Sequence, residues 1–556
     1  MRILDGYVLA KLAKCLVDKF DNVPRMLRKT GLNVDDRTLK RMLNGRSVRQ
    51  RGAEDLVELA NVHLTPRELH NCRVPESPLY AITRPYDQNM KDGPPRRNDA
   101  IAASDLQRSP VDLWGRQIAS CFGAASAPWT STLPWALEME RRSCDIITMG
   151  SFRSRKREVY RPSSNFAFPI EPALPFQALD GVDDLAQIEV QQNDDHIDPR
   201  EPMTMFNVHG SPSPPPESWL RSIADTRSRL RSTTALIVSL LPSHENGGGN
   251  PRECFLKDTK DVVSMVVNTL DVRNLPDAIE LNLSYPTEEG VWAQVYLDPD
   301  LVAEACRRAR EVVDESGSEI KLVAKAGPMS EREARAFVAA SAPFVDGFSL
   351  INAVRTPAVR NLGRNVLQPF FGPKFKLAAM TGAAIRQVSL DTVRHVVAAL
   401  ESQGISGKKI LAMGGVSEPQ HVDEFRSRGA HCVQAATVLY QRPNFGALIR
   451  QHLSGNGAID PSDPTTWTQE HRDQWIGQEL TGALDDPVLL AFSTDGKGAA
   501  KSGASTLETM RLYISRIATR ARSPKSSFEP EQDDTTLWED NNDDNHHVNG
   551  NEITTD

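Results

Sequence analysis

Eight short apolar runs recur through the middle of the chain and predict buried β-strands. Most are followed by a segment with apolar residues at helical spacing. Strands alternating with helices indicate βα units and a parallel sheet, and eight is the strand number of a closed (β/α)8 barrel. The predicted strands are 118–124, 146–149, 235–240, 279–283, 320–324, 347–351, 410–413 and 432–435. Amphipathic helices are predicted at 301–313, 331–340, 390–400 and 421–428.

The sequence before, between and after these runs predicts further domains and linkers. Residues 1–72 predict a small all-helical module, and 73–115, rich in Pro, Arg, Asn and Asp, predict a linker that buries no core. The α/β barrel of the TIM type is expected over 116–455, with a long excursion at 159–200 that could act as a lid. A helical extension at 456–522 and a disordered acidic tail at 523–556 complete the prediction.

The N-terminal module has the order helix, short turn, helix and an Asn-Gly stop, which is similar to the helix-turn-helix of phage-repressor-like proteins. Its basic residues could contact DNA phosphates. The residues expected there are Arg37, Lys40, Arg41 and Arg46. A helical adaptor that binds protein through a solvated basic surface is the alternative interpretation.

Composition narrows the class of protein. The 39% hydrophobic and 25% charged residues are typical of a globular protein, and no apolar run is long enough to span a bilayer. Charges interrupt the first residues early, unlike a signal peptide. The 7 Cys lack Cys-x-x-Cys spacing, so we expect no metal site and no disulfide framework. A cytoplasmic protein is the prediction.

The predicted strand at 279–283 runs into the polar sequence Asn282-Leu283-Ser284-Tyr285-Pro286. Polar side chains at the carboxyl end of a parallel strand are where α/β enzymes place their chemistry. This stretch resembles the dihydroorotate dehydrogenase family, FMN-dependent barrels that carry Asn-Leu-Ser-Cys-Pro-Asn or a Ser in place of the Cys. In that family the Cys or Ser is the catalytic base. Here Tyr285 stands in its place, and Thr287 stands where the family has the last Asn.

Further motifs carry the resemblance along the barrel. Gly414-Gly415, followed by Ala436-Thr437, is similar to the family's phosphate-binding run, with Ala436 where Gly is usual. Ala125-Ser126-Ala127-Pro128 resembles the family's Ala-Ser-Gly-Pro over the flavin. Lys325 matches a strand-five Lys that reaches the flavin ring. The resemblance implies an FMN site built from Ala125, Ser126, Gly150, Ser151, Lys325, Gly382, Gly414, Gly415, Ala436 and Thr437.

The resemblance also implies a substrate site. Asn207, in an Asn-x-x-Gly sequence, is similar to the family's substrate loop, and His209 adds a titratable group to it; an exposed loop histidine is the alternative. Asn352 matches an Asn at the end of strand six. The substrate residues expected are Asn207, His209, Asn282, Thr287 and Asn352. A Lys that the family carries after strand one or two is absent here.

Tyr285 decides the expected direction of the chemistry. A free tyrosine has a pKa of about 10, so at neutral pH it is better suited to donate a proton than to take one. We therefore expect Tyr285 and Lys325 to be catalytic, with Tyr285 protonating a C=C bond that reduced flavin reduces. The alternative is that Tyr285 is a loop aromatic in a barrel that has lost catalysis.

Together these features predict an FMN-dependent oxidoreductase that acts on a C–C or C=C bond of a small, pyrimidine-like substrate. A homodimer is also expected. The alternative is a DNA-binding regulator whose barrel senses flavin or another ligand without turnover, since both would share a flavin site.

Overall fold

The structure, a computed structural model, describes residues 78–82, 84–95, 108–160, 165–170, 187–192, 202–245, 249–288, 290–362 and 366–454. The expected N-terminal module with Arg37, Lys40, Arg41 and Arg46 lies outside these residues. So do the C-terminal extension and the acidic tail. All three stay predictions. Within the described part, no helix is both long and apolar enough to cross a membrane.

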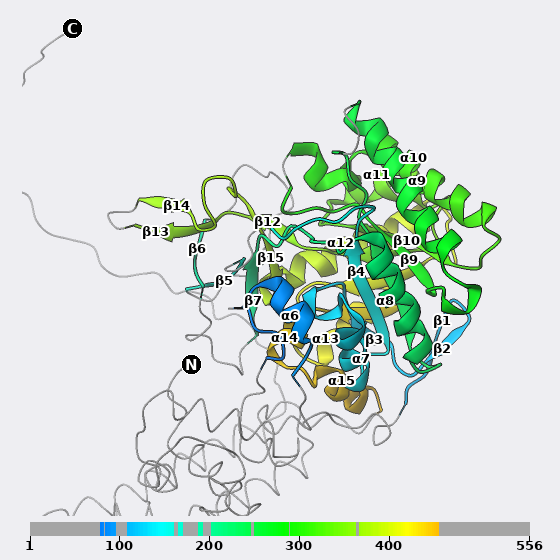
Figure 1. The fold of residues 1–556 in the computed structure, drawn as a ribbon, viewed down its shortest axis with the longest axis horizontal. Helices are drawn as coiled ribbons and strands as arrows, with labels where there is room; N and C mark the ends of the chain where they lie inside the picture. Colours follow the sequence, from blue (N-terminus) through cyan, green and yellow to red (C-terminus); the bar gives the residue numbers. More distant parts are fainter. Residues whose placement is uncertain are drawn as a thin grey trace, which may run out of the picture. The chain divides into compact units, whose positions relative to one another are not determined.

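Eight parallel strands close into a barrel in the order of the sequence, as predicted (Figure 1). The last strand pairs with the first through Val433 and Phe122, which completes the ring. Each strand buries nearly all of its residues, which explains why the apolar runs are continuous. The barrel strands are β3 Phe122–Ala124, β4 Ile146–Phe152, β8 Ala235–Leu240, β9 Ala278–Asn282, β10 Lys321–Ala326, β11 Gly347–Leu350, β16 Lys409–Met413 and β17 Cys432–Ala435.

Helices pack against one another around the outside of the barrel (Figure 1). The four predicted helices correspond to α10 Pro299–Glu315, α11 Glu331–Ser341, α12 Arg386–Ser402 and α13 Gln420–Ser427. Capping explains two of their starts: Asp298 accepts from the backbone of Leu301, and Ser330 forms a capping box with Glu333. The others are α7 Leu133–Arg141, α8 Pro216–Arg229, α9 Pro251–Thr269, α14 Thr437–Gln441 and α15 Phe445–Leu453, with 3₁₀ turns η2 Pro128–Thr130, η4 Val272–Asn274, η5 Gly290–Leu297 and η6 Ala383–Ile385.

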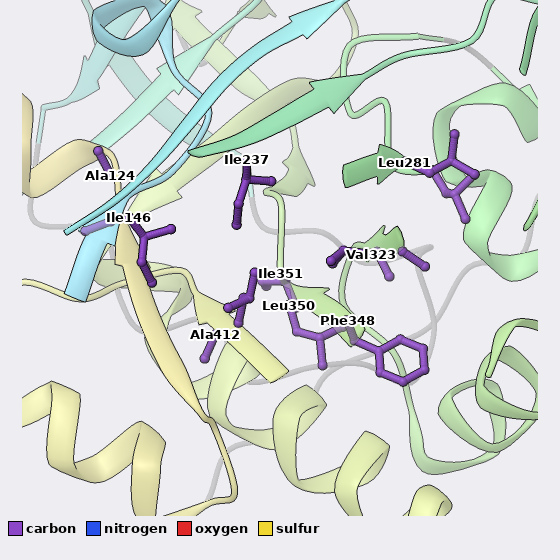
Figure 2. Packing of buried hydrophobic residues seen from close by; sticks show 14 of the residues in the cluster. Ala124, Ile146, Ile237, Leu281, Val323, Phe348, Leu350, Ile351 and Ala412 are labelled. Carbon is purple, nitrogen blue, oxygen red and sulfur yellow. The ribbon is translucent and has the colours of Figure 1, made fainter. Parts of the chain in front are cut away.

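Neighbouring strands contribute aliphatic side chains to one continuous core, including Ile237, Leu281 and Val323 (Figure 2). Burying each such side chain contributes roughly 1.5–3 kcal/mol. Gly123 allows β3 to approach β4 closely, because a Cβ there would lie 2.3 Å from the carbonyl oxygen of Ile146. The hairpin of β1 Val111–Leu113 and β2 Arg116–Ile118 leads into the first barrel strand.

A second sheet, here called the accessory sheet, is built from excursions of the chain between barrel strands. The region expected to form a lid contributes two of its strands. The sequence pattern did not predict the sheet, because several of its strands pair with partners far away in the sequence. Its order is β12 Val354–Thr356, β15 Ala378–Gly382, β7 Thr204–Asn207, β5 Phe166–Pro169, β6 Ile188–Gln191, β13 Ala358–Asn361 and β14 Leu367–Pro369. The β13–β14 pair reaches away from the barrel (Figure 1).

Part of the range assigned to a linker is folded on the barrel. Helix α6 (Tyr86–Asp92) follows a turn in which Tyr80 is 3% exposed. The Tyr80 ring packs on Trp129, Trp135 and Phe166, with centroid distances of 5.6–6.2 Å. The expectation that this range buries no core therefore does not hold for residues 78–82, 84–95 and 108–115. Tyr80, Tyr86 and Leu113 are buried there, although the surrounding composition is polar.

Candidate functional site

A cavity lies between the carboxyl ends of the barrel strands and the accessory sheet. Its empty volume is about 870 Å³, including space open to solvent. This is the end of a parallel barrel at which loops converge and ligands bind. The lining residues that have a role predicted from the sequence are Ser126, Gly150, Ser151, Asn207, His209, Asn282, Thr287, Lys325, Asn352, Ala436 and Thr437. The fold thus brings most of the predicted site residues together.

Lys325 lies in the wall of the cavity although it belongs to a core strand. Its side chain is 3% exposed, and its Nζ lies 3.2 Å from Oε1 of the fully buried Glu280 on the neighbouring strand. Strand register sets Asn282 directly beside Lys325. A buried ammonium needs such a partner, because an isolated charge is costly to remove from water. The pair therefore places a fixed positive group at the inner end of the site.

Side chains around Lys325 are held by hydrogen bonds to the surrounding loops. Asn282 Nδ2 donates to Ser151 Oγ at 3.1 Å, and its Oδ1 accepts from the Ser284 amide at 3.1 Å. Asn352 Nδ2 donates to the Ser284 carbonyl at 2.7 Å, and Ser126 Oγ donates to the Gly150 carbonyl at 2.6 Å. These bonds fix the amide and hydroxyl groups before a ligand arrives, which lowers the cost of binding.

Ala436 and Thr437, at the end of the last barrel strand, line the opposite part of the cavity. Thr437 Oγ1 donates to Thr381 Oγ1 at 3.0 Å, and this bond links the barrel to β15 of the accessory sheet. Ala436 and Thr437 thus lie at the position where barrels commonly bind phosphate.

The paired glycines are placed differently from the prediction. Gly414 and Gly415 do not line the cavity. A Cβ on Gly415 would lie 2.4 Å from Cα of Arg386, so the glycine serves the close packing of its loop on the start of α12. Gly382 has φ +87° and packs behind Thr437, and Ala125 is buried with its amide bonded to Ala435. Ala125, Gly382, Gly414 and Gly415 are thus outside the lining of the cavity, and their contact with a flavin stays a prediction.

Tyr285 also lies outside the cavity, although the next two residues, Pro286 and Thr287, line it. Its ring packs on Phe255 at 6.5 Å, it is 5% exposed, and its hydroxyl is buried with no hydrogen-bond partner among the described residues. Burial raises the pKa of the hydroxyl well above its ordinary value. This placement does not support Tyr285 as the proton donor predicted from the sequence; it fits a core aromatic.

Replacing Tyr285 with phenylalanine is expected to leave the rate of substrate reduction within about twofold of the parent. The free energy of unfolding should stay equal or rise by up to about 1 kcal/mol, because a buried hydroxyl without a partner is removed. Single-turnover kinetics and urea unfolding measure the two effects. A tenfold or greater loss of rate in a variant that still binds flavin would show that Tyr285 takes part in the reaction.

His209 contributes an aromatic polar group to the wall formed by the accessory sheet. Its ring lies 4.9 Å from the ring of Tyr86 and 5.7 Å from that of Phe166, and its buried Nδ1 has no hydrogen-bond partner among the described residues. Burial lowers the pKa of His209 to about 3, so the imidazole is neutral at physiological pH. His209 is half-buried in the loop that follows β7 and lines the cavity, so the alternative of an exposed loop histidine does not fit its placement.

Several lining residues had no predicted role. Tyr86 comes from the assigned linker, Phe166 and Met205 from the accessory sheet, and Trp129 from the turn after β3. The aromatic residues in otherwise polar sequence were the available signal, since large aromatic side chains are seldom left without a packing partner.

A charged group beside the cavity is here called the Glu288 cluster. Its arginines Arg153 and Arg157 were expected either to replace the missing Lys or to form a solvated basic loop, and their carboxylate partner Glu288 was not predicted. Glu288 Oε1 accepts from the Tyr160 hydroxyl at 2.8 Å and from Arg157 at 3.1 Å, and it lies 3.6 Å from Arg153. Arg355 donates to the Glu288 carbonyl at 3.0 Å. The cluster fixes the loop that follows β9, which carries two of the lining residues.

Comparison with known proteins gives a consistent match over the barrel. The family described as dihydroorotate dehydrogenase matches residues 201–455. A dihydroorotate dehydrogenase of Dictyostelium discoideum is 25% identical over 376 residues, which cover 66% of this chain and 95% of the relative. The catalytic subunit of dihydroorotate dehydrogenase B (NAD(+)) from Thermoplasma volcanium is 33% identical over 168 residues, 30% of this chain and 49% of the relative. The subunit of that name from Pyrococcus horikoshii is 26% identical over 260 residues, 47% and 72% of the two chains.

Proposed function

We propose that this chain, whose barrel is that of a dihydroorotate dehydrogenase-like oxidoreductase, uses FMN to transfer a hydride to or from a carbon–carbon bond of a small substrate. The observation that carries the proposal is the cavity at the carboxyl end of the barrel. There a buried ammonium, Lys325, is surrounded by side-chain amides and hydroxyls. Such a preorganised site suits a ligand that gains negative charge during reaction.

The residues present fit a flavin at the inner end of the cavity. Lys325 would contact the pyrimidine edge of the ring, with Asn282 and Ser126 beside it, and Ala436 and Thr437 would lie toward the phosphate. When bound, FMN supplies a two-electron acceptor and donor of hydride. The positive charge of Lys325 would stabilise the charge that develops on the reduced ring.

The other side of the cavity would hold the substrate. Asn207, Asn352 and Thr287 present hydrogen-bonding groups there. Phe166 of the accessory sheet, together with Tyr86 and Trp129, adds apolar surface to the lining. In the direction of reduction, one carbon of the substrate C=C bond would receive a hydride from bound FMN in its reduced form, and the neighbouring carbon would receive a proton from solvent water at the open side of the cavity. Binding the flavin on one side of the cavity and the substrate on the other would hold the reacting atoms close together. Such positioning accounts for a large part of the rate acceleration in enzymes.

The regulator with a non-catalytic barrel is not favoured. The relatives that match the barrel carry the names of dehydrogenases or their catalytic subunits. The DNA contact, the homodimer and the cytoplasmic location expected from the sequence stay predictions.

The flavin is the first test. Protein purified from cells and then incubated with FMN is expected to be yellow, with about one FMN released per chain on acid denaturation. After anaerobic photoreduction, addition of a substrate with an activated C=C bond should restore the oxidised flavin spectrum. A colourless protein that takes up no FMN would contradict the cofactor assignment. A flavoprotein that no unsaturated compound reoxidises would contradict the reaction.

A further inference from the structure

We infer that Glu280 sets the redox potential of the bound flavin by acting through Lys325. The carboxylate holds the ammonium in place and cancels part of its positive charge, so the flavin gives up a hydride more readily than it would beside an uncompensated lysine. The inference rests on the proposed function, because it concerns the flavin side of the same cavity. Glu280 is a positioning residue, since it is not among the residues that line the cavity.

Glu280 lies one layer below the floor of the cavity. It is the middle residue of β9, two positions before Asn282, which lines the cavity at the carboxyl end of the strand. Side chains two positions apart on a strand share a face and are separated by roughly 6–7 Å along it. Parallel register places Asn282 beside Lys325. The ammonium of Lys325 is therefore closer to a ligand in the cavity than the carboxylate of Glu280 is.

The carboxylate of Glu280 is paired with Lys325 and with no other described side chain. Its side chain is 0% exposed, and its Oε1 lies 3.2 Å from Nζ of Lys325. Neither carboxylate oxygen accepts a hydrogen bond from another residue in the described part of the chain. Its register partners are Val323 and Ser239, and the Ser239 hydroxyl shares a hydrogen bond with that of Ser151. The charge of Glu280 therefore acts mainly on the ammonium of Lys325.

A stabilising role does not account for this pair. The interior of a parallel barrel is normally filled with bulky branched side chains. Replacing a buried ion pair by apolar residues of similar volume is often neutral or stabilising, because removing two charges from water is costly. Lys325, however, lines the cavity, where an ammonium can act on a ligand. A carboxylate buried directly beneath that ammonium therefore indicates a role in the chemistry of the site.

The charges of the pair determine the direction of the effect. A reduced flavin ring carries more negative charge than an oxidised ring, so a nearby cation stabilises the reduced state and raises the potential. A carboxylate behind the cation has the opposite effect, and salt screens a buried charge only weakly. Glu280 should therefore lower the potential from the value that Lys325 alone would set. A lower potential favours hydride transfer from the flavin to a substrate C=C bond, the direction expected from the sequence.

The redox potential of the FMN-loaded protein tests the inference without a substrate. In Glu280→Gln, which keeps the shape of the side chain but removes its charge, the ratio of reduced to oxidised flavin at a given potential is expected to rise at least fivefold. For a two-electron couple this corresponds to an upward shift of about 20 mV. Glu280→Asp keeps the charge and should raise the ratio less than threefold. Anaerobic reduction in the presence of a dye of known potential measures the ratio.

Asp258→Asn is the matched control. The Asp258 carboxylate is also buried, but it lies on α9, outside the lining of the cavity, and accepts from the Ser243 amide at 2.7 Å. Its replacement should lower the thermal midpoint, because a charged hydrogen bond is weakened, and should raise the flavin ratio less than threefold. If Glu280→Gln does not fold, Glu280→Met, which is also uncharged, gives the same comparison.

The possible outcomes separate the inference from the flavin assignment. A rise of less than fivefold or a fall in the uncharged Glu280 variant would overturn the inference, as would a rise of threefold or more in Glu280→Asp or Asp258→Asn. Each of these results leaves the flavin assignment intact. A parent protein that takes up no FMN would contradict the proposed function and the inference together.

Discussion

Replacing Lys325 with methionine is expected to lower the rate of flavin-dependent reduction about 10²- to 10³-fold and to weaken FMN binding. The side chain is the single charged group among the described residues lining the cavity, and removal of one preorganised electrostatic group commonly has an effect of this size. The change also leaves Glu280 buried without its partner 3.2 Å away. Breaking a buried pair costs about 3–5 kcal/mol of the free energy of unfolding.

The double variant Lys325→Met with Glu280→Gln separates the two effects. It should recover most of the stability, because no buried carboxylate is left unpaired, but none of the FMN affinity or rate. Urea unfolding, flavin titration and single-turnover reduction measure the three quantities. Lys321→Met, on the same strand but with a half-buried side chain, is the control and should change each little. A Lys325→Met protein that retains FMN and full rate would refute the assignment.

Replacing Arg450 with methionine is expected to lower the free energy of unfolding by about 3–5 kcal/mol. The Arg450 side chain is 1% exposed, and its Nε donates to Asp145 Oδ2 at 2.9 Å. Ser120 Oγ donates to the same oxygen at 2.6 Å. The pair joins α15, the last described helix, to the residue just before β4. Its loss leaves a buried carboxylate with only one weaker partner among these groups.

This prediction is tested by comparing the urea unfolding of the Arg450→Met and Arg307→Met variants. Arg307 lies on the surface of α10, where it pairs with Glu304 and Glu311, and such exposed pairs contribute at most about 1 kcal/mol. The double variant Arg450→Met with Asp145→Leu should be more stable than Arg450→Met alone. Equal midpoints for Arg450→Met and Arg307→Met would mean that the buried pair is not a main support of the barrel.

The barrel could be predicted from the sequence because its strands are buried on both faces. Runs such as 235–240 are almost entirely apolar, and each barrel strand pairs with the next barrel strand along the chain, so the order of the ring follows from the order of the sequence. The accessory sheet gave no such pattern. Strand β6 (Ile188–Gln191) is mostly half-buried, and its neighbour β13 (Ala358–Asn361) lies far away in the sequence. Short strands with remote partners carry little local information.

The prediction of the candidate site was most accurate for side chains near the ends of barrel strands. Lys325 and Asn282 lie side by side because parallel register places them there. The direction of the Tyr285 side chain was predicted wrongly because the loop that carries it is bonded to η5, the next element of the chain. The Tyr285 amide donates to the Ala293 carbonyl, and the Tyr296 amide donates to the Leu283 carbonyl. Side chains alternate between the two faces of a strand only as far as the strand extends. The direction of a side chain in the following loop therefore cannot be predicted from this alternation.

The accessory sheet has a consequence for the order of events on the ribosome. Strand β7, which brings Asn207 to the cavity, pairs with β15, and the Thr381 hydroxyl bonds to the Met205 carbonyl across 176 positions of sequence. An elongating chain therefore holds the β7 segment without this neighbour until residue 382 has emerged. Contacts of such long range form slowly. This wall of the cavity is thus completed late in synthesis, before β16 pairs with β11 and β17 closes the barrel on β3.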